Sequence, residues 1–174
     1  MKARRIVLIA HDVRSCHNIG SLMRTAEGFG VDHLYLSGYS PYPEVPKDKR
    51  LPHLRAKLTR QIHKTALGAE NTLEWSHEAN IKSLITFLKS DGYTIAALEQ
   101  TPDSIDLGNY DPPNKIALLA GNEIDGLNQP VLDSCDIHLQ IPMSGSKESF
   151  NVTVAAAIGL YHLRFAELWP GQAR

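Results

Sequence analysis

The sequence predicts an α/β fold with a mostly parallel sheet and helices on both faces. Short apolar runs alternate along the chain with segments whose apolar residues recur at helical spacing, and this alternation is typical of parallel sheets. The 174 residues, of which 43% are hydrophobic and 21% charged, are ordinary for one globular domain with a sizeable core. We therefore expect residues 1–174 to form a single domain.

The first expected element is a buried strand over residues 6–10, an apolar run directly after a basic start. The run is too short for a signal peptide or a membrane helix, and a polar pair ends it. A helix follows, with Asn18 as its cap and an apolar stripe that continues to about Phe29. Gly30 ends this helix, and the next strand is expected at residues 33–36.

The segment 40–46 contains three prolines and is expected to be a loop, because each proline removes a hydrogen-bond donor and fixes φ. It does not separate two domains, since neither side holds enough residues for a second core. The same patterns then predict helices over about 53–67, 81–89 and 127–132, and strands over 93–98, 115–120 and 138–141. A final helix begins after residue 151.

Composition argues against several classes of protein. Cys16 and Cys135 are too few for a disulfide framework, and the eight histidines show no pair at metal-ligand spacing, so we expect no metal. No partner histidine is placed to activate Cys16 as a nucleophile. No apolar stretch approaches the roughly 18 residues of a membrane helix, so we expect a cytoplasmic protein without a membrane contact.

Positive charge is concentrated in one segment. The net charge is −1, yet residues 47–64 hold seven Lys or Arg against one Asp, a local balance of +6. Such a segment suits a phosphate backbone, while the alternative is a solvated helix face. The candidate phosphate contacts are Lys49, Arg50, Arg55, Arg60 and Lys64.

Three polar motifs follow predicted strands, and ligands in parallel sheets bind at the carboxyl ends of strands. We therefore expect the motifs to gather at one edge of the sheet. No glycine-rich dinucleotide or P-loop pattern follows any strand, which argues against a Rossmann or NTPase site. The motifs are Asn18-Ile19-Gly20-Ser21-Leu22-Met23-Arg24-Thr25, Gly121-Asn122-Glu123-Ile124-Asp125-Gly126 and Ile141-Pro142-Met143-Ser144-Gly145-Ser146-Lys147-Glu148-Ser149-Phe150-Asn151-Val152.

Together the three motifs resemble the signature of the SpoU/TrmH branch of the SPOUT superfamily. Its members are knotted S-adenosylmethionine-dependent methyltransferases that modify the ribose 2′-hydroxyl of RNA. The resemblance spans about residues 6–165, and residues 63–70 followed by Trp75 also resemble this branch. It implies S-adenosylmethionine as the cofactor, RNA as the partner and a deep trefoil knot in the C-terminal third. Because small single-domain members often act on tRNA, it favours tRNA over rRNA.

The resemblance implies that Arg24 lies at the reacting hydroxyl, whereas its position alone favours a surface ion pair with Glu27. A free guanidinium has a pKa above about 12 and is hardly a base at neutral pH. We therefore expect Arg24 to bind the substrate phosphate and to stabilise negative charge on the 2′-oxygen. The proton passes to water or to a strongly perturbed Arg24, and the sequence leaves both open.

Glu123 is expected to hold Arg24 or Asn18 in place or to oppose the sulfonium charge, and Gly121 to permit close approach of the cofactor. The two glycines of this motif also suit an ordinary turn. The catalytic candidates that the resemblance implies are Asn18, Arg24, Glu123, Ser149 and Asn151.

The third motif is expected to bind the cofactor through apolar walls and side-chain hydrogen bonds, although Ser149 and Asn151 also suit helix capping. Phe150 departs from the leucine that is usual in the family and could reshape the pocket. The expected cofactor-binding residues are Leu98, Glu99, Gly121, Ile141, Met143, Ser149, Phe150 and Asn151.

The final helix carries two apolar stripes and therefore needs two surfaces to pack against. One is the core, and we expect the other to be a second subunit in a homodimer, as the family implies. The stripes are Val152, Ala155, Ala156, Gly159, Leu160 and Leu163, and Val154, Ile158, Tyr161, Phe165 and Leu168.

The leading interpretation is an RNA 2′-O-ribose methyltransferase. The alternatives are an rRNA rather than a tRNA substrate, a non-catalytic RNA-binding protein that retains the fold, and a methyltransferase for small molecules. The intact motif residues oppose the second alternative, and the basic segment opposes the third.

Overall fold

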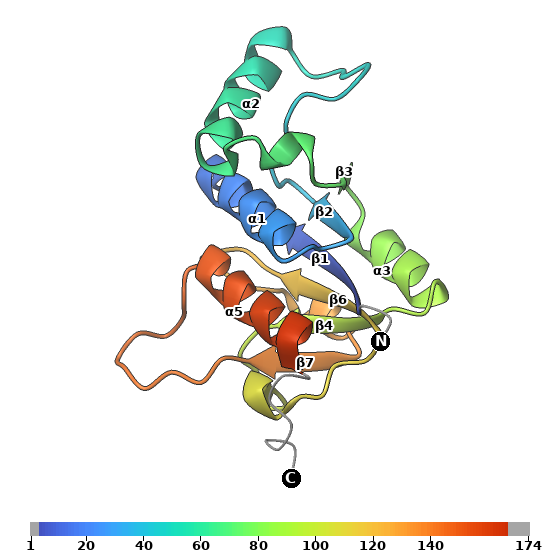
Figure 1. Ribbon diagram of the computed structural model, residues 1–174, viewed down its shortest axis with the longest axis vertical. Coiled ribbons are helices and arrows are strands. Elements are labelled where there is room, and N and C mark those ends of the chain that lie inside the picture. The colour runs from blue at the N-terminus through green and yellow to red at the C-terminus, as the bar shows by residue number, and fades with distance from the viewer. Residues whose placement is uncertain (1–3, 167–174) are drawn as a thin grey trace.

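The computed structural model describes residues 4–166, which form one sheet covered by helices (Figure 1). The strands lie in the order β3-β2-β1-β6-β4-β7-β5, and every neighbouring pair is parallel. The predicted α/β class with a mostly parallel sheet is confirmed. The described strands are β1 (Arg5–His11), β2 (His33–Ser37), β3 (Trp75–Glu78), β4 (Thr94–Leu98), β5 (Ile105–Asp106), β6 (Lys115–Ala120) and β7 (Ile137–Gln140).

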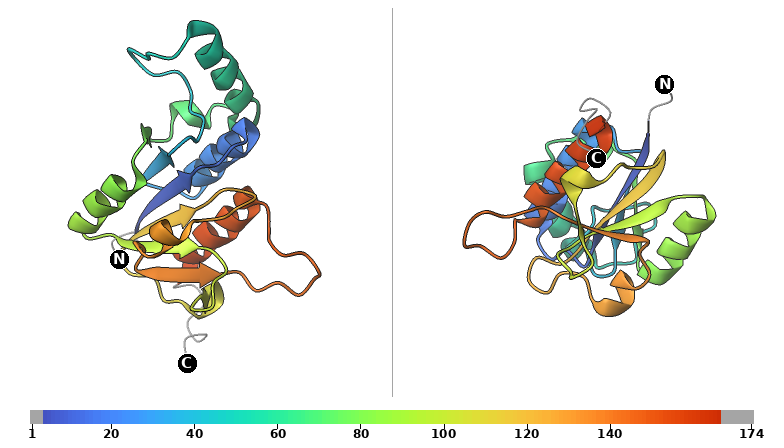
Figure 2. Two further views of the ribbon diagram at one scale, coloured as in Figure 1. Left: turned by 180° about the vertical axis from the view of Figure 1, so that it is seen from behind. Right: turned by 90° about the horizontal axis from the view of Figure 1, so that it is seen from below.

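Helices cover both faces of the sheet, as expected. Helices α1 and α5 lie side by side on one face, and α3 and α4 lie on the other (Figure 2). The described helices are α1 (Cys16–Gly28), α2 (Pro52–Ala66), α3 (Ile81–Ser90), α4 (Gln129–Leu132) and α5 (Val152–Phe165), with 3-10 turns η1 (Ala69–Asn71) and η2 (Leu107–Asn109).

Strands β3 and β5 were not predicted. β3 has the sequence Trp-Ser-His-Glu, without a buried apolar side chain, and β5 has only two residues. They occupy the two edges of the sheet, where pairing to one neighbour suffices and apolar periodicity is not required. The signal for these strands is therefore their tertiary pairing and not their local pattern.

Helix α1 begins at Cys16, and the prediction that Asn18 caps it was wrong. The hydroxyl of Ser15 accepts a hydrogen bond from the backbone N–H of Asn18 at 3.2 Å and fills the capping role. The Asn18 side chain is consequently available for a partner elsewhere in the fold. The short helix α4 likewise begins two residues later than expected, after the cap Asn128.

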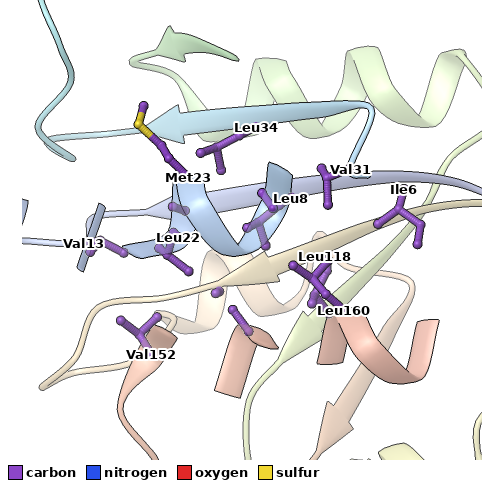
Figure 3. Packing of buried hydrophobic residues seen from close by; sticks show 14 of the residues in the cluster. Ile6, Leu8, Val13, Leu22, Met23, Val31, Leu34, Leu118, Val152 and Leu160 are labelled. Atoms are coloured by element: carbon purple, nitrogen blue, oxygen red, sulfur yellow. The ribbon is translucent and has the colours of Figure 1, made fainter. Parts of the chain in front are cut away.

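Alternation along the strands divides the core between the two faces of the sheet. Ile6 and Leu8 of β1 point toward α1 and α5, whereas Val7 and Ile9 join the cluster under α3 and α4. Figure 3 shows the first cluster, in which Leu22 of α1 and Leu160 of α5 meet the sheet. The labelled residues are Ile6, Leu8, Val13, Leu22, Met23, Val31, Leu34, Leu118, Val152 and Leu160.

Helix α2 packs against the N-terminal half of α1, and the contact involves mainly the C-terminal half of α2 (Figure 1). The two backbones approach so closely at Gly20 that an added Cβ would collide with the carbonyl of Ile62 and the hydroxyl of Thr65. The same hydroxyl donates to the carbonyl of His17 at 2.8 Å. These contacts fix the position of α2 along α1, next to the first motif.

Helix α5 buries one of its two predicted apolar stripes. Val152, Ala156 and Leu160 are buried, whereas Val154 and Tyr161 of the second stripe are 44% and 46% exposed. Leu168, which the sequence assigned to the second stripe, lies outside the described residues. The trefoil knot stays a prediction.

Candidate active site

A cavity of about 340 Å³ opens where β4, β6 and β7 end, so the second and third motifs meet as expected. Its volume is within the usual range of about 300–1,000 Å³ for small-molecule sites. All but one of the predicted cofactor-binding residues line it, namely Leu98, Glu99, Gly121, Ile141, Met143, Ser149 and Phe150. The exception is Asn151.

Asn151 serves as the N-cap of α5, as the alternative interpretation of this residue held. Its side-chain oxygen accepts hydrogen bonds from the backbone N–H and the hydroxyl of Thr153, at 2.9 and 2.6 Å. The loop before it carries Ser149 and Phe150 across the mouth of the cavity, and the Phe150 side chain is 39% exposed. An exposed aromatic ring at this mouth can pack on a bound ligand.

The charged side chains that line the cavity are all acidic. They are Glu99, Glu123, Asp125 and Glu148, and no Lys or Arg lies among the lining residues of the described chain. The apolar walls come from Leu98, Ile141, Met143 and Phe150. A cavity with apolar walls and an acidic rim favours a ligand that is partly apolar and positively charged.

Glu99 shapes the cavity through the protein's own backbone. Its carboxylate accepts hydrogen bonds from the backbone N–H groups of Leu127 and Gln100, at 3.0 and 3.1 Å. Gly126 has a φ of +64° and touches the same carboxylate, which leaves no room for a side chain there. Glu99 therefore holds the second motif against the end of β4, a role that the sequence analysis did not foresee.

Gly121 is also required by the turn itself. An added Cβ would lie 2.8 Å from the side chain of Leu127 and 2.9 Å from the backbone of Gly126. The side chain of Asn122 then accepts hydrogen bonds from the backbone N–H groups of Ile124 and Asp125, at 2.8 and 3.3 Å. Gly121 thus serves the turn and also lines the cavity.

Glu123 joins the second motif to the first. Its carboxylate accepts a hydrogen bond from the side-chain amide of Asn18 at 2.7 Å and longer ones from the backbone N–H groups of Arg14 and Ser15, at 3.2 and 3.5 Å. Partial burial raises the pKa of Glu123, but these hydrogen bonds outweigh it and hold the pKa below its ordinary value. Of the two partners considered for Glu123, the structure selects Asn18 and not Arg24.

A second layer of side chains supports this junction and was missed by the sequence analysis. The Asn122 side chain donates to the hydroxyl of Tyr39, which also accepts from Arg14 at 3.5 Å. Arg14 in turn lies 3.4 Å from Asp125. Tyr39 follows β2, so the rule that sites form at the carboxyl ends of strands could have indicated it.

Arg24 lies in a different hollow, between α1, α2 and α5, which Lys64, Thr65 and Ala157 also line. It is exposed and forms no ion pair with Glu27 or any other described residue. Six residues separate it from Asn18, which corresponds to about 9 Å of rise and about 120° around the helix. A single copy of the chain therefore presents Asn18 and Arg24 in different directions.

The predicted phosphate contacts fall into two groups. Arg50 forms an ion pair with Asp48, whose side chain is only 2% exposed, and donates to the carbonyls of Tyr42 and Pro43. Hydrogen bonds from Arg50 hold the pKa of Asp48 well below its usual range. Arg55 pairs with Glu44 at 3.0 Å and donates to the Asp48 carbonyl.

Both arginines thus fasten the loop before α2. Lys49, Arg60 and Lys64 are instead exposed and form no ion pair with the described chain.

No helix within residues 4–166 has the length and hydropathy to cross a membrane. No group of three or more potential His, Cys, Asp or Glu ligands gathers in the same range.

Structures of known proteins share this fold. The TrmH/SpoU tRNA modifying enzyme of A. aeolicus superposes with a TM-score of 0.76 at 23% identity, over 95% of this chain and 79% of the other. The SpoU methyltransferase AviRb of Streptomyces viridochromogenes, solved with AdoMet, superposes with a TM-score of 0.75 at 22% identity, over 100% and 61%. At these identities the likeness establishes the fold alone.

Sequence comparison is more specific. The chain is 31% identical over 163 residues to the tRNA (guanosine(18)-2′-O)-methyltransferase of Borreliella burgdorferi, covering 94% of this chain and 67% of that protein. It is also 31% identical over 157 residues to the 23S rRNA (guanosine-2′-O-)-methyltransferase RlmB of Nitrosomonas europaea, covering 90% and 54%. The chain thus spans between about half and two thirds of these relatives. The model of the SpoU rRNA Methylase family matches residues 5–161, and the chain belongs to this family, as its motifs predicted.

Proposed function

We propose that this chain is an RNA 2′-O-ribose methyltransferase that uses S-adenosylmethionine and takes tRNA as its substrate. The observation that carries the proposal is the division of charge between two hollows. One has apolar walls and an acidic rim, and the other holds Arg24 and Lys64. The first suits a cationic cofactor with an apolar adenine, and the second suits the phosphates of RNA.

The residues of the acidic cavity fit S-adenosylmethionine in kind. Leu98, Ile141 and Met143 offer apolar walls for the adenine, and the hydroxyl of Ser149 offers a hydrogen bond at the mouth. S-adenosylmethionine, when bound, supplies the methyl group as a sulfonium electrophile. The carboxylates of Glu123 and Glu148 favour a positive charge in this cavity.

Arg24 acts on the RNA and not on the cofactor. Its guanidinium donates hydrogen bonds to a substrate phosphate and stabilises negative charge that develops on the 2′-oxygen. Glu123 fixes the Asn18 amide, so that the first and second motifs keep one geometry while the 2′-hydroxyl passes its proton to water and its oxygen takes the methyl group. Asn18 and Glu123 are thus positioning residues in this scheme, and Ser149 is a cofactor contact.

A homodimer through α5 reconciles the two directions in which Asn18 and Arg24 face. The exposed stripe that includes Val154 and Tyr161 offers an apolar surface for a second copy. Ala157, on the same helix, lines the hollow of Arg24. A second copy bound to this stripe would therefore border the hollow of Arg24. The acidic cavity of that second copy would then lie next to RNA bound by Arg24 of the first.

The test is methyl transfer from radiolabelled S-adenosylmethionine to separate pools of unmodified tRNA and rRNA, followed by digestion to nucleosides. Label in a 2′-O-methylated nucleoside from tRNA supports the proposal. The relatives named for 23S rRNA and for tRNA are both 31% identical to this chain, so rRNA is the second candidate substrate. Label found only in the rRNA pool would show that rRNA, and not tRNA, is the substrate. Binding of the cofactor without transfer to either pool would count against both substrates. Failure to bind the cofactor would favour a non-catalytic RNA-binding protein.

A further inference from the structure

Helix α2 carries a row of cations that the fold leaves free. Lys57, Arg60 and Lys64 are exposed and form no ion pair with residues 4–166. Their spacing of three and four residues places them on one stripe of the helix, over roughly 10 Å of its axis. The helix contains no Asp or Glu that could neutralise them.

The basic segment as a whole is therefore not a uniform patch. Arg50 and Arg55 point into the loop and are neutralised by Asp48 and Glu44. Lys47 and Lys49 of the loop and the three cations of the stripe are exposed and form no ion pair with the described residues, so they remain available to an outside anion. The sequence could not separate the two groups, because both consist of Lys and Arg within the same stretch.

The stripe leads to the hollow of Arg24. Lys64, its last member, lines that hollow together with Arg24. The close approach at Gly20 and the hydrogen bond from Thr65 to His17 hold this end of α2 against α1. The backbone positions of Lys64 and Arg24 relative to each other are consequently set by the packing of α2 on α1 and not by loops.

The turn after α2 reinforces this arrangement. Leu67 adopts a left-handed conformation with a φ of +53°, and Gly68 follows with a φ of +99°. The Glu70 carboxylate accepts a hydrogen bond from the Gly68 N–H at 3.0 Å and contacts His63 of α2. The side chain of Trp75 donates to the Glu70 carbonyl at 2.9 Å. The turn is thus fastened to both α2 and β3.

We propose that Lys57, Arg60 and Lys64 form a track for the phosphate backbone of an unpaired RNA strand and that the track leads a ribose to Arg24. The proposal rests on the proposed function and names how its substrate reaches the site. A single row of cations matches a single backbone, whereas a duplex presents two. The roughly 10 Å of the row corresponds to about three nucleotides at a stacked rise of about 3.4 Å.

The test compares the wild-type chain with the variant K57Q/R60Q/K64Q in binding to an unmodified tRNA transcript at several salt concentrations. Each phosphate contact contributes about −0.7 to the slope of log K against log salt for a single strand. Loss of three contacts should reduce the magnitude of the slope by about 2 and weaken binding roughly 100-fold at 0.1 M salt. The matched control is K82Q, which removes an exposed lysine of α3 on the other face of the sheet and should change neither quantity.

A slope and affinity for the triple variant equal to those of the wild type would overturn the track. Steady-state kinetics provide a second test. Contacts away from the reacting ribose stabilise the bound RNA equally in the ground state and in the transition state, so their loss changes KM and not kcat. K57Q/R60Q should raise the KM for RNA and leave kcat at saturating RNA unchanged, and a fall in kcat alone would contradict the assignment. Binding of S-adenosylmethionine to each variant, measured by calorimetry, should equal that of the wild type.

The experiments distinguish failure of the proposed function from failure of the track. A wild-type chain that binds S-adenosylmethionine but methylates no RNA refutes the function whatever the salt slope is. A wild-type chain that methylates RNA, beside a triple variant with an unchanged slope, refutes the track alone.

Discussion

The junction between the first and second motifs can be tested through Glu123→Ala. The substitution removes the carboxylate that accepts from Asn18 at 2.7 Å and from two backbone N–H groups at 3.2 and 3.5 Å. Hydrogen bonds to a charged group contribute about 1.5–3 kcal/mol each, but the two long bonds and the partial exposure of the site reduce the sum. We expect a loss of about 2 kcal/mol in the free energy of unfolding.

For a domain of this size, that loss corresponds to a fall of roughly 4–8 °C in Tm. Thermal unfolding measures it, and Glu148→Ala is the matched control. Glu148 lines the same cavity but is exposed and forms no ion pair with the described residues, so its removal should change stability by less than about 0.5 kcal/mol. A double-mutant cycle with Asn18→Ala should give a coupling free energy of about 1 kcal/mol.

The pH dependence of the same variant provides an independent check. The pKa of Glu123 is lower in the folded chain than its ordinary value near 4.3, so the charged carboxylate stabilises the fold above that value. The stability difference between wild type and Glu123→Ala should persist from neutral pH to about pH 5 and shrink as the pH falls through the lowered pKa. Additive effects in the cycle, or a difference that stays constant in acid, would refute the role given to Glu123.

Four further substitutions test other parts of the structure. Arg24→Ala should lower kcat for methyl transfer by roughly 10²–10³-fold without lowering Tm, because the side chain is exposed, and retained activity would remove Arg24 from the site. Gly20→Ala should cost about 1–3 kcal/mol in thermal unfolding, since its Cβ meets backbone that cannot yield, and an unchanged Tm would mean that α2 can shift along α1. Arg50→Lys should lower Tm by several degrees, because an ammonium cannot form the forked contacts to Asp48 and two carbonyls, and a Tm equal to that of wild type would show that charge alone suffices. Tyr161→Glu should convert the dimer to a monomer in sedimentation velocity, and a monomeric wild type would exclude the proposed interface.

Much of the fold could be predicted because its signals are local. The run at residues 115–120 coincides with β6, and the periodic segments coincide with α2 and α3 to within one or two residues. Hydrophobic periodicity reports the side of each element that faces the core, whatever lies on the other side of the core. β3 and β5 escaped prediction because edge strands owe their structure to pairing with a neighbour.

The lining of the cavity includes seven of the eight residues expected to bind a cofactor, because they follow strands that end at one edge of the sheet. Their individual roles were not predicted. Glu99 holds the backbone of Leu127, and Asn151 caps α5, although both were expected to contact a cofactor. A motif indicates that a residue type is needed, but the partner of each polar atom depends on what the fold brings within about 3 Å.

The sequence by itself determined the α/β class, the membership of the SpoU family and the set of residues at the end of β4, β6 and β7. Only the tertiary structure decided that Glu123 holds Asn18 rather than Arg24, and that Arg60 and Lys64 stay free while Arg50 is bound within its loop. The physical reason is the distance along the chain over which each interaction acts. Periodicity and capping act within a few residues, whereas Asn18 and Glu123 are 105 residues apart and meet only because packing of the whole sheet places β1 beside β6.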